Sequence, residues 1–142
     1  IRSYTIPKEK IHLIYNPIDF SRFYPKPRVK HAKKKILFAG SNDYLRAQVV
    51  KDLQSKDCDL LCIGRGFEGP VENIEDYVWA SDETAGIMLG RTTLESWACN
   101  RPAWIYTVDK EGNILKKVRF NPPKDMNFCN RYQVAKQIEA LC

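Results

Sequence analysis

Apolar and polar residues follow one another in a pattern that divides the chain into short apolar runs and longer amphipathic segments. Four apolar runs of six or seven residues predict buried strands, at 35–40, 59–64, 85–90 and 102–108. The segments between these runs predict helices over 41–54, 74–82 and 92–99. In the first helix, apolar residues recur at helical spacing: Leu45, Val49, Val50 and Leu53.

The flanking segments carry weaker patterns. Residues 11–16 predict a short strand, and 23–35, with two prolines and many charges, predict a linker or exposed loop. After the fourth strand, a turn at 109–113 leads to a further strand over 114–120. The last prediction is an amphipathic helix over 130–141, with three apolar residues on one face: Val134, Ile138 and Leu141.

This order of elements predicts an α/β fold, a Rossmann-like parallel sheet with helices on both faces. We place that domain at 35–142, after a basic inter-domain segment and leading strand over 1–34. In such sheets, ligands bind at the carboxyl ends of the strands. Three predicted strands end in glycine, at Gly40, Gly64 and Gly90. Each glycine taken alone is better explained by a structural turn, whereas three in register favour a ligand-binding edge.

The net charge of +6 is concentrated near the N-terminus. Residues 1–35 hold ten Lys or Arg against two acidic residues, whereas the remaining 107 residues hold 13 basic and 15 acidic ones. A basic arm suits nucleic acid, an anionic membrane surface or an acidic partner, and a solvated linker explains it equally well. A nucleic-acid-binding module would also need basic and aromatic residues on the folded surface, which the net charge of −2 there disfavours.

Length and cysteine usage narrow the class of protein further. At 142 residues the chain fits a single domain, and no apolar run approaches the roughly 20 residues that span a bilayer. The five cysteines are irregularly spaced, form no Cys-x-x-Cys pair and are distant in sequence from both histidines. This pattern disfavours zinc and redox motifs and favours reduced, mostly buried thiols in a cytoplasmic protein.

Several stretches carry a family pattern when they are taken in order. They are IHLIYNPIDFSRFYP, KILFAGSND, LLCIGRG and, most telling, SDETAGIMLGRTTLESWACNRPAWIY. Over about residues 11–140, their order and spacing resemble the C-terminal, donor-binding half of glycosyltransferases with the GT-B fold. The nearest resemblance is to glycosyltransferase family 4. That family has an entry segment, two strands that end in glycine, and a strand followed by a helix with a Glu-Ala-like motif.

The resemblance implies a two-domain enzyme that moves a sugar from a nucleoside diphosphate sugar (NDP-sugar) to an acceptor, with this chain as the donor half. An N-terminal acceptor half would precede Ile1, so we expect this chain alone not to turn over. Such enzymes usually need no divalent metal or further cofactor, because basic side chains and helix N-termini carry the diphosphate charge. The implied partners are the NDP-sugar, the acceptor half and, through the basic segment, an anionic membrane surface on the cytoplasmic side.

The resemblance also implies a diphosphate site built from two loops. The residues of the first loop are Gly40, Ser41 and Arg46. Because SNDYLRAQ departs from the family's Gly-Arg…Lys-Gly pattern, Arg46 is equally explained as a solvent-facing helix residue. The residues of the second loop are Gly90, Arg91, Thr92 and Thr93. There, a guanidinium and a helix N-terminus would stabilise the negative charge that develops on the departing diphosphate.

Glu95 corresponds to the family glutamate that accepts hydrogen bonds from both ribose hydroxyls, a geometry that suits a carboxylate. A second interpretation stays open, because Thr92-Thr93-Leu94-Glu95 fits a capping box in which Glu95 reaches back to the helix N-terminus. Helical spacing places Thr92, Glu95 and Cys99 on one face, opposite the apolar face, which would keep Glu95 out of the core.

One position departs from the family. Family 4 usually has another glutamate eight residues before the ribose-binding one, and here that position is Ile87. Asp82 and Glu83 lie nearby, but we place them before the strand. The sugar, the base, the acceptor and the stereochemical outcome are therefore not predicted. A sugar-nucleotide epimerase with the same fold remains an alternative, weakened because both histidines, His12 and His31, fall in the N-terminal arm.

Overall fold

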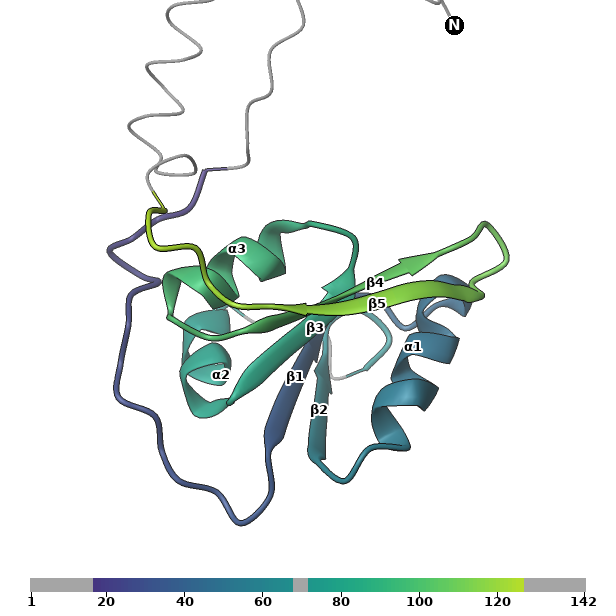
Figure 1. Cartoon of the computed structure of the whole chain (residues 1–142), viewed down its shortest axis with the longest axis horizontal. Coiled ribbons are helices and arrows are strands. Elements are labelled where there is room, and N and C mark those ends of the chain that lie inside the picture. The colour runs from purple at the N-terminus through teal and green to yellow at the C-terminus, as the bar shows by residue number, and fades with distance from the viewer. Residues whose placement is uncertain (1–16, 68–71, 127–142) are drawn as a thin grey trace, which may run out of the picture.

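The computed structural model describes residues 17–67 and 72–126. These residues form a five-stranded sheet in the order β2-β1-β3-β4-β5 with helices on both faces, which confirms the predicted Rossmann-like α/β fold (Figure 1). The strands are β1 (Lys35–Ala39), β2 (Asp59–Ile63), β3 (Glu83–Ile87), β4 (Ala103–Val108) and β5 (Ile114–Phe120). The helices are α1 (Tyr44–Gln54), α2 (Ile74–Ala80) and α3 (Arg91–Ala98).

The strand order reverses next to β1. The chain runs from β1 through α1 to β2 on one side of β1, then through α2 to β3 on its other side. The strands β1 to β4 are parallel, and β5 pairs antiparallel with β4. In open parallel sheets the carboxyl edge at such a reversal is the usual place for a ligand. Here the loops that follow β1 and β3 flank that point.

Alternating residues of β1 divide the core into two layers. Ile36 and Phe38 pack with Val49 and Leu53 of α1 on one face of the sheet. Leu37 packs on the other face, in a cluster that contains buried residues of α2 and α3. Figure 1 shows α1 on one side of the sheet and the other two helices on the opposite side. Period-2 alternation in a doubly covered strand explains this division.

The predicted elements are confirmed for the described residues, with one clear error of position. The strand predicted at 85–90 is β3, which begins at Glu83 and ends at Ile87. Our placement of Glu83 before the strand is therefore wrong: it pairs with Ile36 of β1 and is 2% exposed. Hydrophobicity does not mark a charged residue as a strand position, and here ion pairs make its burial tolerable. The predicted strand at 11–16 and helix at 130–141 lie outside the described residues.

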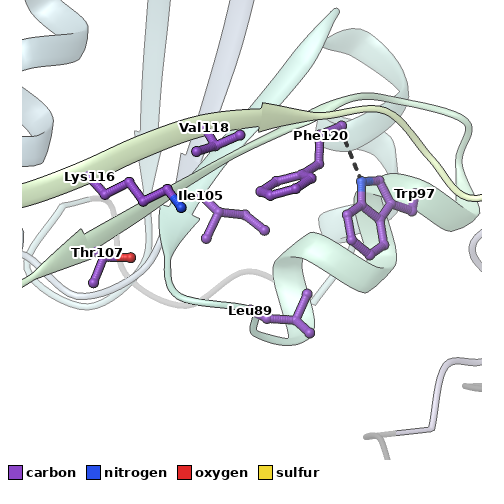
Figure 2. Close-up of a pocket in the computed structure, with 7 residues that line it drawn as sticks. All are labelled: Leu89, Trp97, Ile105, Thr107, Lys116, Val118 and Phe120. Carbon is purple, nitrogen blue, oxygen red and sulfur yellow. Dashed lines mark hydrogen bonds between the residues drawn. The ribbon is translucent and has the colours of Figure 1, made fainter.

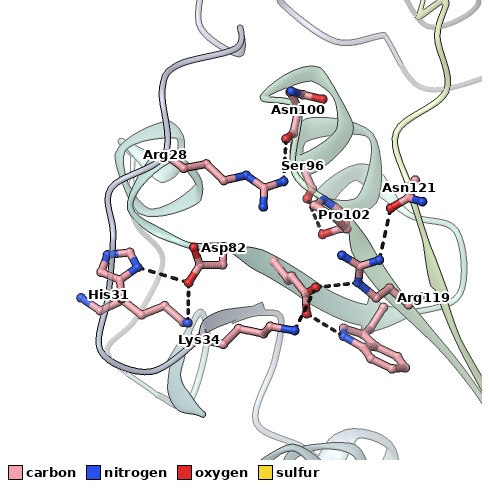
Figure 3. Close-up of polar contacts among 12 residues, drawn as sticks. Arg28, His31, Lys34, Asp82, Ser96, Asn100, Pro102, Arg119 and Asn121 are labelled. Carbon is pink, nitrogen blue, oxygen red and sulfur yellow. Dashed lines mark hydrogen bonds and ion pairs between the residues drawn. The ribbon is translucent and has the colours of Figure 1, made fainter.

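Two carboxylates at the start of β3, those of Asp82 and Glu83, are bound by other residues of the fold (Figure 3). Burial pushes the pKa of Glu83 upward, yet hydrogen bonds from Arg119 and Trp104 and the charge of Lys34 hold it below its usual range. Asp82 accepts hydrogen bonds from the Lys35 amide at 2.8 Å and pairs with His31 at 3.2 Å. Both acids lie at the amino edge of the sheet, the edge opposite the expected site.

Residues 17–34, which we call the leading segment, are largely exposed but fastened to the fold. Phe23 is buried among residues of α2 and α3. Further along, Trp79 donates to the carbonyl of Tyr24 at 2.8 Å. The guanidinium of Arg101, 1% exposed, donates to the carbonyl of Lys26 at 3.2 Å. The predicted exposed loop therefore has a defined path along the α2 and α3 side of the domain.

Two predictions from the sequence concern membrane-spanning segments and the state of the cysteine thiols. In the described part of the chain, no helix has the length and apolar character needed to cross a bilayer. Cys58, Cys62 and Cys99 are free thiols; the first two are half-buried, and burial raises the pKa of Cys99 to about 12. Cys129 and Cys142 lie outside the described residues.

Candidate functional site

The residues predicted to bind a diphosphate lie in two loops at the carboxyl edge of the sheet. Gly40 and Ser41 directly follow β1, Gly90 lies between β3 and α3, and Arg91 is the first residue of α3. Because β1 and β3 are neighbouring parallel strands, both loops emerge at the same edge, on the two sides of the chain reversal. The fold thus brings the two predicted groups to one edge of the molecule.

The first loop is held by side-chain and backbone contacts. Arg46 is half-buried and forms an ion pair with Asp43, from Nη1 to Oδ2 at 2.7 Å. The Asp43 side chain also caps α1 by accepting from the amide of Arg46. A methyl group added at Gly40 would lie 3.2 Å from Nε of Arg46, so this arginine lies directly over the loop. Its guanidinium thus has a carboxylate partner within α1 and its N-cap, and contacts the loop as well.

Gly64 holds the loops after β1 and β2 together. Its φ of +124° is in a region that favours glycine, and a Cβ there would lie 2.0 Å from the carbonyl oxygen of Gly40. The Gly40 amide donates to the carbonyl of Ile63 at 3.0 Å, and the Asn42 amide to that of Arg65 at 2.7 Å. The backbone of the first predicted phosphate loop is thereby fixed before any ligand binds.

The second loop leaves open space at the start of α3. Gly90 is the N-cap residue, and no side chain caps the helix. A Cβ at Gly90 would have no atom within 4 Å. The first amides of an α-helix have no partner within the helix, so those of Arg91, Thr92 and Thr93 point toward this edge. With the positive end of the helix dipole, they form a region that favours an anion.

The structure contradicts two predictions about Glu95: that it could complete a capping box, and that it lies outside the core. The helix begins at Arg91, so Thr92 is not the cap residue and the capping box does not form. Glu95 is 7% exposed rather than outward-facing, and Cys99 on the same face is fully buried. The reason is tertiary: Ile18 and Phe23 of the leading segment pack in the cluster that contains Leu94 and Cys99. That cover comes from a distant part of the chain, so helical spacing could not predict it.

The Glu95 carboxyl group is nearly buried and has no hydrogen-bond partner among the described residues. Burial raises its pKa to about 7, against the opposing effects of Arg91 and Arg22. In the described part of the structure every fully buried side-chain nitrogen or oxygen has a partner, so the Glu95 oxygens still reach solvent. An acceptor of this kind is available to a ligand that brings its own donors.

Two further charged residues, which the sequence analysis did not single out, influence the pKa of Glu95: Arg22 lowers it and Glu75 raises it. Arg22, in the leading segment, donates from Nη2 to a carboxylate oxygen of Glu75 and to the carbonyl of Glu72 at 2.8 Å. Arg22 and Glu75 are 53 residues apart, and no local pattern connects them. Their proximity depends on the leading segment lying beside α2 and α3.

A separate apolar pocket lies between α3 and the β4–β5 pair (Figure 2). Its volume is about 340 Å³, and its lining is Leu89, Trp97, Ile105, Thr107, Lys116, Val118 and Phe120. None of the predicted site residues contributes to it, and one lysine is the only charged residue of the lining. Its chemistry does not suit a diphosphate, so the charged carboxyl edge remains the candidate site.

Neither a protein-family model nor a curated protein nor a solved structure matches this chain. The fold and the edge geometry define a Rossmann-like α/β domain with an anion-favouring helix N-terminus and an available carboxylate one turn further along α3. Within the described residues, no three His, Cys, Asp or Glu side chains are grouped so as to hold a metal ion.

Proposed function

We propose that this chain binds an NDP-sugar and is the donor-binding half of a GT-B glycosyltransferase, which transfers the sugar to an acceptor. One observation carries the proposal. Arg91 and Glu95 are one turn apart on α3, yet among the described residues Arg91 has no ion pair and Glu95 no hydrogen bond. Glu95 is nearly buried while its oxygens remain open to solvent, and ionisable groups in such surroundings are concentrated at functional sites.

The two groups suit the two ends of a nucleoside diphosphate. The Arg91 guanidinium and the first amides of α3 would bind the phosphates and stabilise the charge that grows as the bond to the sugar breaks. The space at Gly90 would admit the phosphates close to the backbone. Ser41 and Arg46 follow β1 at the same edge and would contribute donors from the other side of the ligand, beside Gly40, whose own amide is bound to the carbonyl of Ile63.

Glu95 would bind the ribose. An ionised carboxylate accepts two hydrogen bonds, and two neighbouring hydroxyls supply two donors with matching spacing. These donors would replace the partners that Glu95 lacks, so the ligand would favour the ionised form. Because the pKa of Glu95 is about 7, nucleotide affinity would rise as the pH increases through neutrality.

The sugar itself stays unassigned, for a structural reason. Ile87 is the last residue of β3, and the loop of Met88, Leu89 and Gly90 contains no carboxylate. Asp82 and Glu83, the nearest acids to Ile87 in sequence, lie at the opposite edge, bound to His31 and Arg119. The contacts that family 4 makes to sugar hydroxyls from this loop would therefore need other groups.

A thermal-shift series on the 142-residue chain tests the proposal. It compares UDP, GDP, their sugars and short oligonucleotides, each at low and high salt. We expect a nucleoside diphosphate to stabilise the chain, by about 2.7 kcal/mol at a hundredfold excess over its Kd. Arg91→Gln should reduce that stabilisation. If only oligonucleotides stabilise the chain, with a steep salt dependence, the glycosyltransferase proposal is wrong.

A further inference from the structure

The three cations of β5 differ in what they contact. Side chains alternate between the two faces of a strand, so Lys117 and Arg119 lie on one face of β5 and Lys116 on the other. Lys117 is paired with Asp52 at 3.0 Å, and Arg119 is bound to Glu83. Among the described residues, Lys116 has neither an ion pair nor a hydrogen bond. Its side chain instead lines the apolar pocket between α3 and the β4–β5 pair.

This pocket has two unlike ends (Figure 2). Toward the carboxyl end of β4, Thr107 pairs directly with Lys116 across the two strands, which places a hydroxyl beside an ammonium group. At the other end lie the rings of Trp97 and Phe120. Trp97 is held there by a hydrogen bond from its Nε1 to the carbonyl of Phe120 at 3.3 Å. One end of the pocket is therefore polar and positive, and the other is aromatic.

The apolar side chains of the pocket remain in contact with water. Phe120 is 44% exposed and Leu89 is 48% exposed, while Ile105 and Val118 are half-buried. Apolar side chains that line one hollow indicate a binding site, whereas apolar residues scattered singly over a surface do not. The volume of about 340 Å³ suits a small molecule.

We propose that this pocket binds a carboxylic acid with an apolar chain of medium length. Its carboxylate lies at Lys116 and Thr107, and its chain runs toward the rings of Trp97 and Phe120. One ammonium and one hydroxyl match a monoanion, whereas a phosphate dianion would need further donors. Burial of the chain supplies most of the affinity, and the exposed ammonium selects the head group. This ligand is additional to the proposed nucleotide and binds elsewhere on the domain.

Three ligands with the same chain and different head groups test the charge of the site: octanoate, octanol and octyltrimethylammonium, each below its micelle concentration. NMR of the ¹⁵N-labelled full chain follows the indole N–H of Trp97 and the amides of β4 and β5. We expect saturable shifts of these signals. Octanoate should bind about threefold to fivefold more tightly than octanol, as an exposed ion pair predicts, and the ammonium compound should bind most weakly.

Matched variants locate the two ends of the ligand. Lys116→Gln should remove the preference for octanoate over octanol, and Lys110→Gln, an exposed lysine in the β4–β5 turn, should leave it unchanged. Phe120→Ala should weaken all three ligands, whereas Leu115→Ala, an exposed residue outside the pocket, should weaken none.

Three results overturn the proposal: no saturable shifts with octanoate, equal affinity of octanoate and octanol for the wild type, or a preference for octanoate that persists in Lys116→Gln. None of these results bears on the nucleotide site, because the residues predicted for that site do not line this pocket.

Discussion

Ionisation of Glu95 lowers the free energy of unfolding of the protein. Its carboxyl group is 7% exposed, and its pKa of about 7 lies above the usual 4.5 because burial penalises the charged form. The folded chain therefore holds this proton more tightly than the unfolded chain does. Ionisable groups whose pKa is shifted in this way by burial are concentrated at functional sites.

This difference in proton affinity predicts a specific pH dependence of stability. The contribution of Glu95 is fully present below pH 4.5 and is lost as the pH rises through about 7, an overall change of about 3 kcal/mol. Glu95→Gln should lack this change. Urea denaturation of both proteins from pH 4 to 8 measures it, and subtracting the two curves removes the contributions of the other acids, such as Asp82 and Glu83. If the free energy of unfolding of wild type and of Glu95→Gln changes in parallel with pH, the raised pKa of Glu95 is contradicted.

Among the elements, the loops after the parallel strands divide into a rigid part and an open part. Gly64 has no room for a side chain, whereas Gly90 has nothing within 4 Å of an added Cβ. Gly64 therefore fixes the path of the first loop, and Gly90 leaves space for a ligand at α3. These two glycines look alike in the sequence, since each follows an apolar run.

A matched pair of substitutions separates the two roles. Gly64→Ala should destabilise the chain by several kcal/mol, because its Cβ would overlap the carbonyl of Gly40 in a backbone conformation that disfavours alanine. Gly90→Ala should change stability by no more than about 1 kcal/mol, since its backbone is extended and the space is open. Its nucleotide affinity should nevertheless fall. Thermal and urea denaturation measure the two changes in stability. Calorimetric titration with the nucleotide measures the loss of affinity in Gly90→Ala. Equal destabilisation by the two substitutions would contradict this division.

The elements were predictable because local patterns determine them. Apolar runs located β1, β2 and β4 to within a residue or two, and Asp43 marks the start of α1 as the capping pattern indicates. The error at β3 arose because Glu83 is buried by partners 21 and 36 residues away, Trp104 and Arg119. The pattern of hydrophobic residues along the chain does not indicate such long-range polar contacts.

At the scale of the whole molecule, the two edges of the sheet use their charges differently. At the amino edge, Asp82 and Glu83 have partners that tie the leading segment and β5 to β3. At the carboxyl edge, Arg91 and Glu95 lack such partners among the described residues. The alternation of apolar runs and helices in the sequence predicted this edge as the place for a ligand. The burial of Glu95 was not predictable, because it depends on how the leading segment packs against α2 and α3.

The most direct test of the central claim is calorimetric titration of the 142-residue chain with UDP and with GDP at pH 8, where Glu95 is largely ionised. We predict that one of them binds and that Glu95→Gln weakens its binding at least tenfold, because a charge-assisted pair of hydrogen bonds is lost. Glu111→Gln, which removes an exposed carboxylate from the β4–β5 turn, should leave the affinity unchanged. Binding of equal strength to wild type and Glu95→Gln would contradict the account and leave Glu95 with a structural role only.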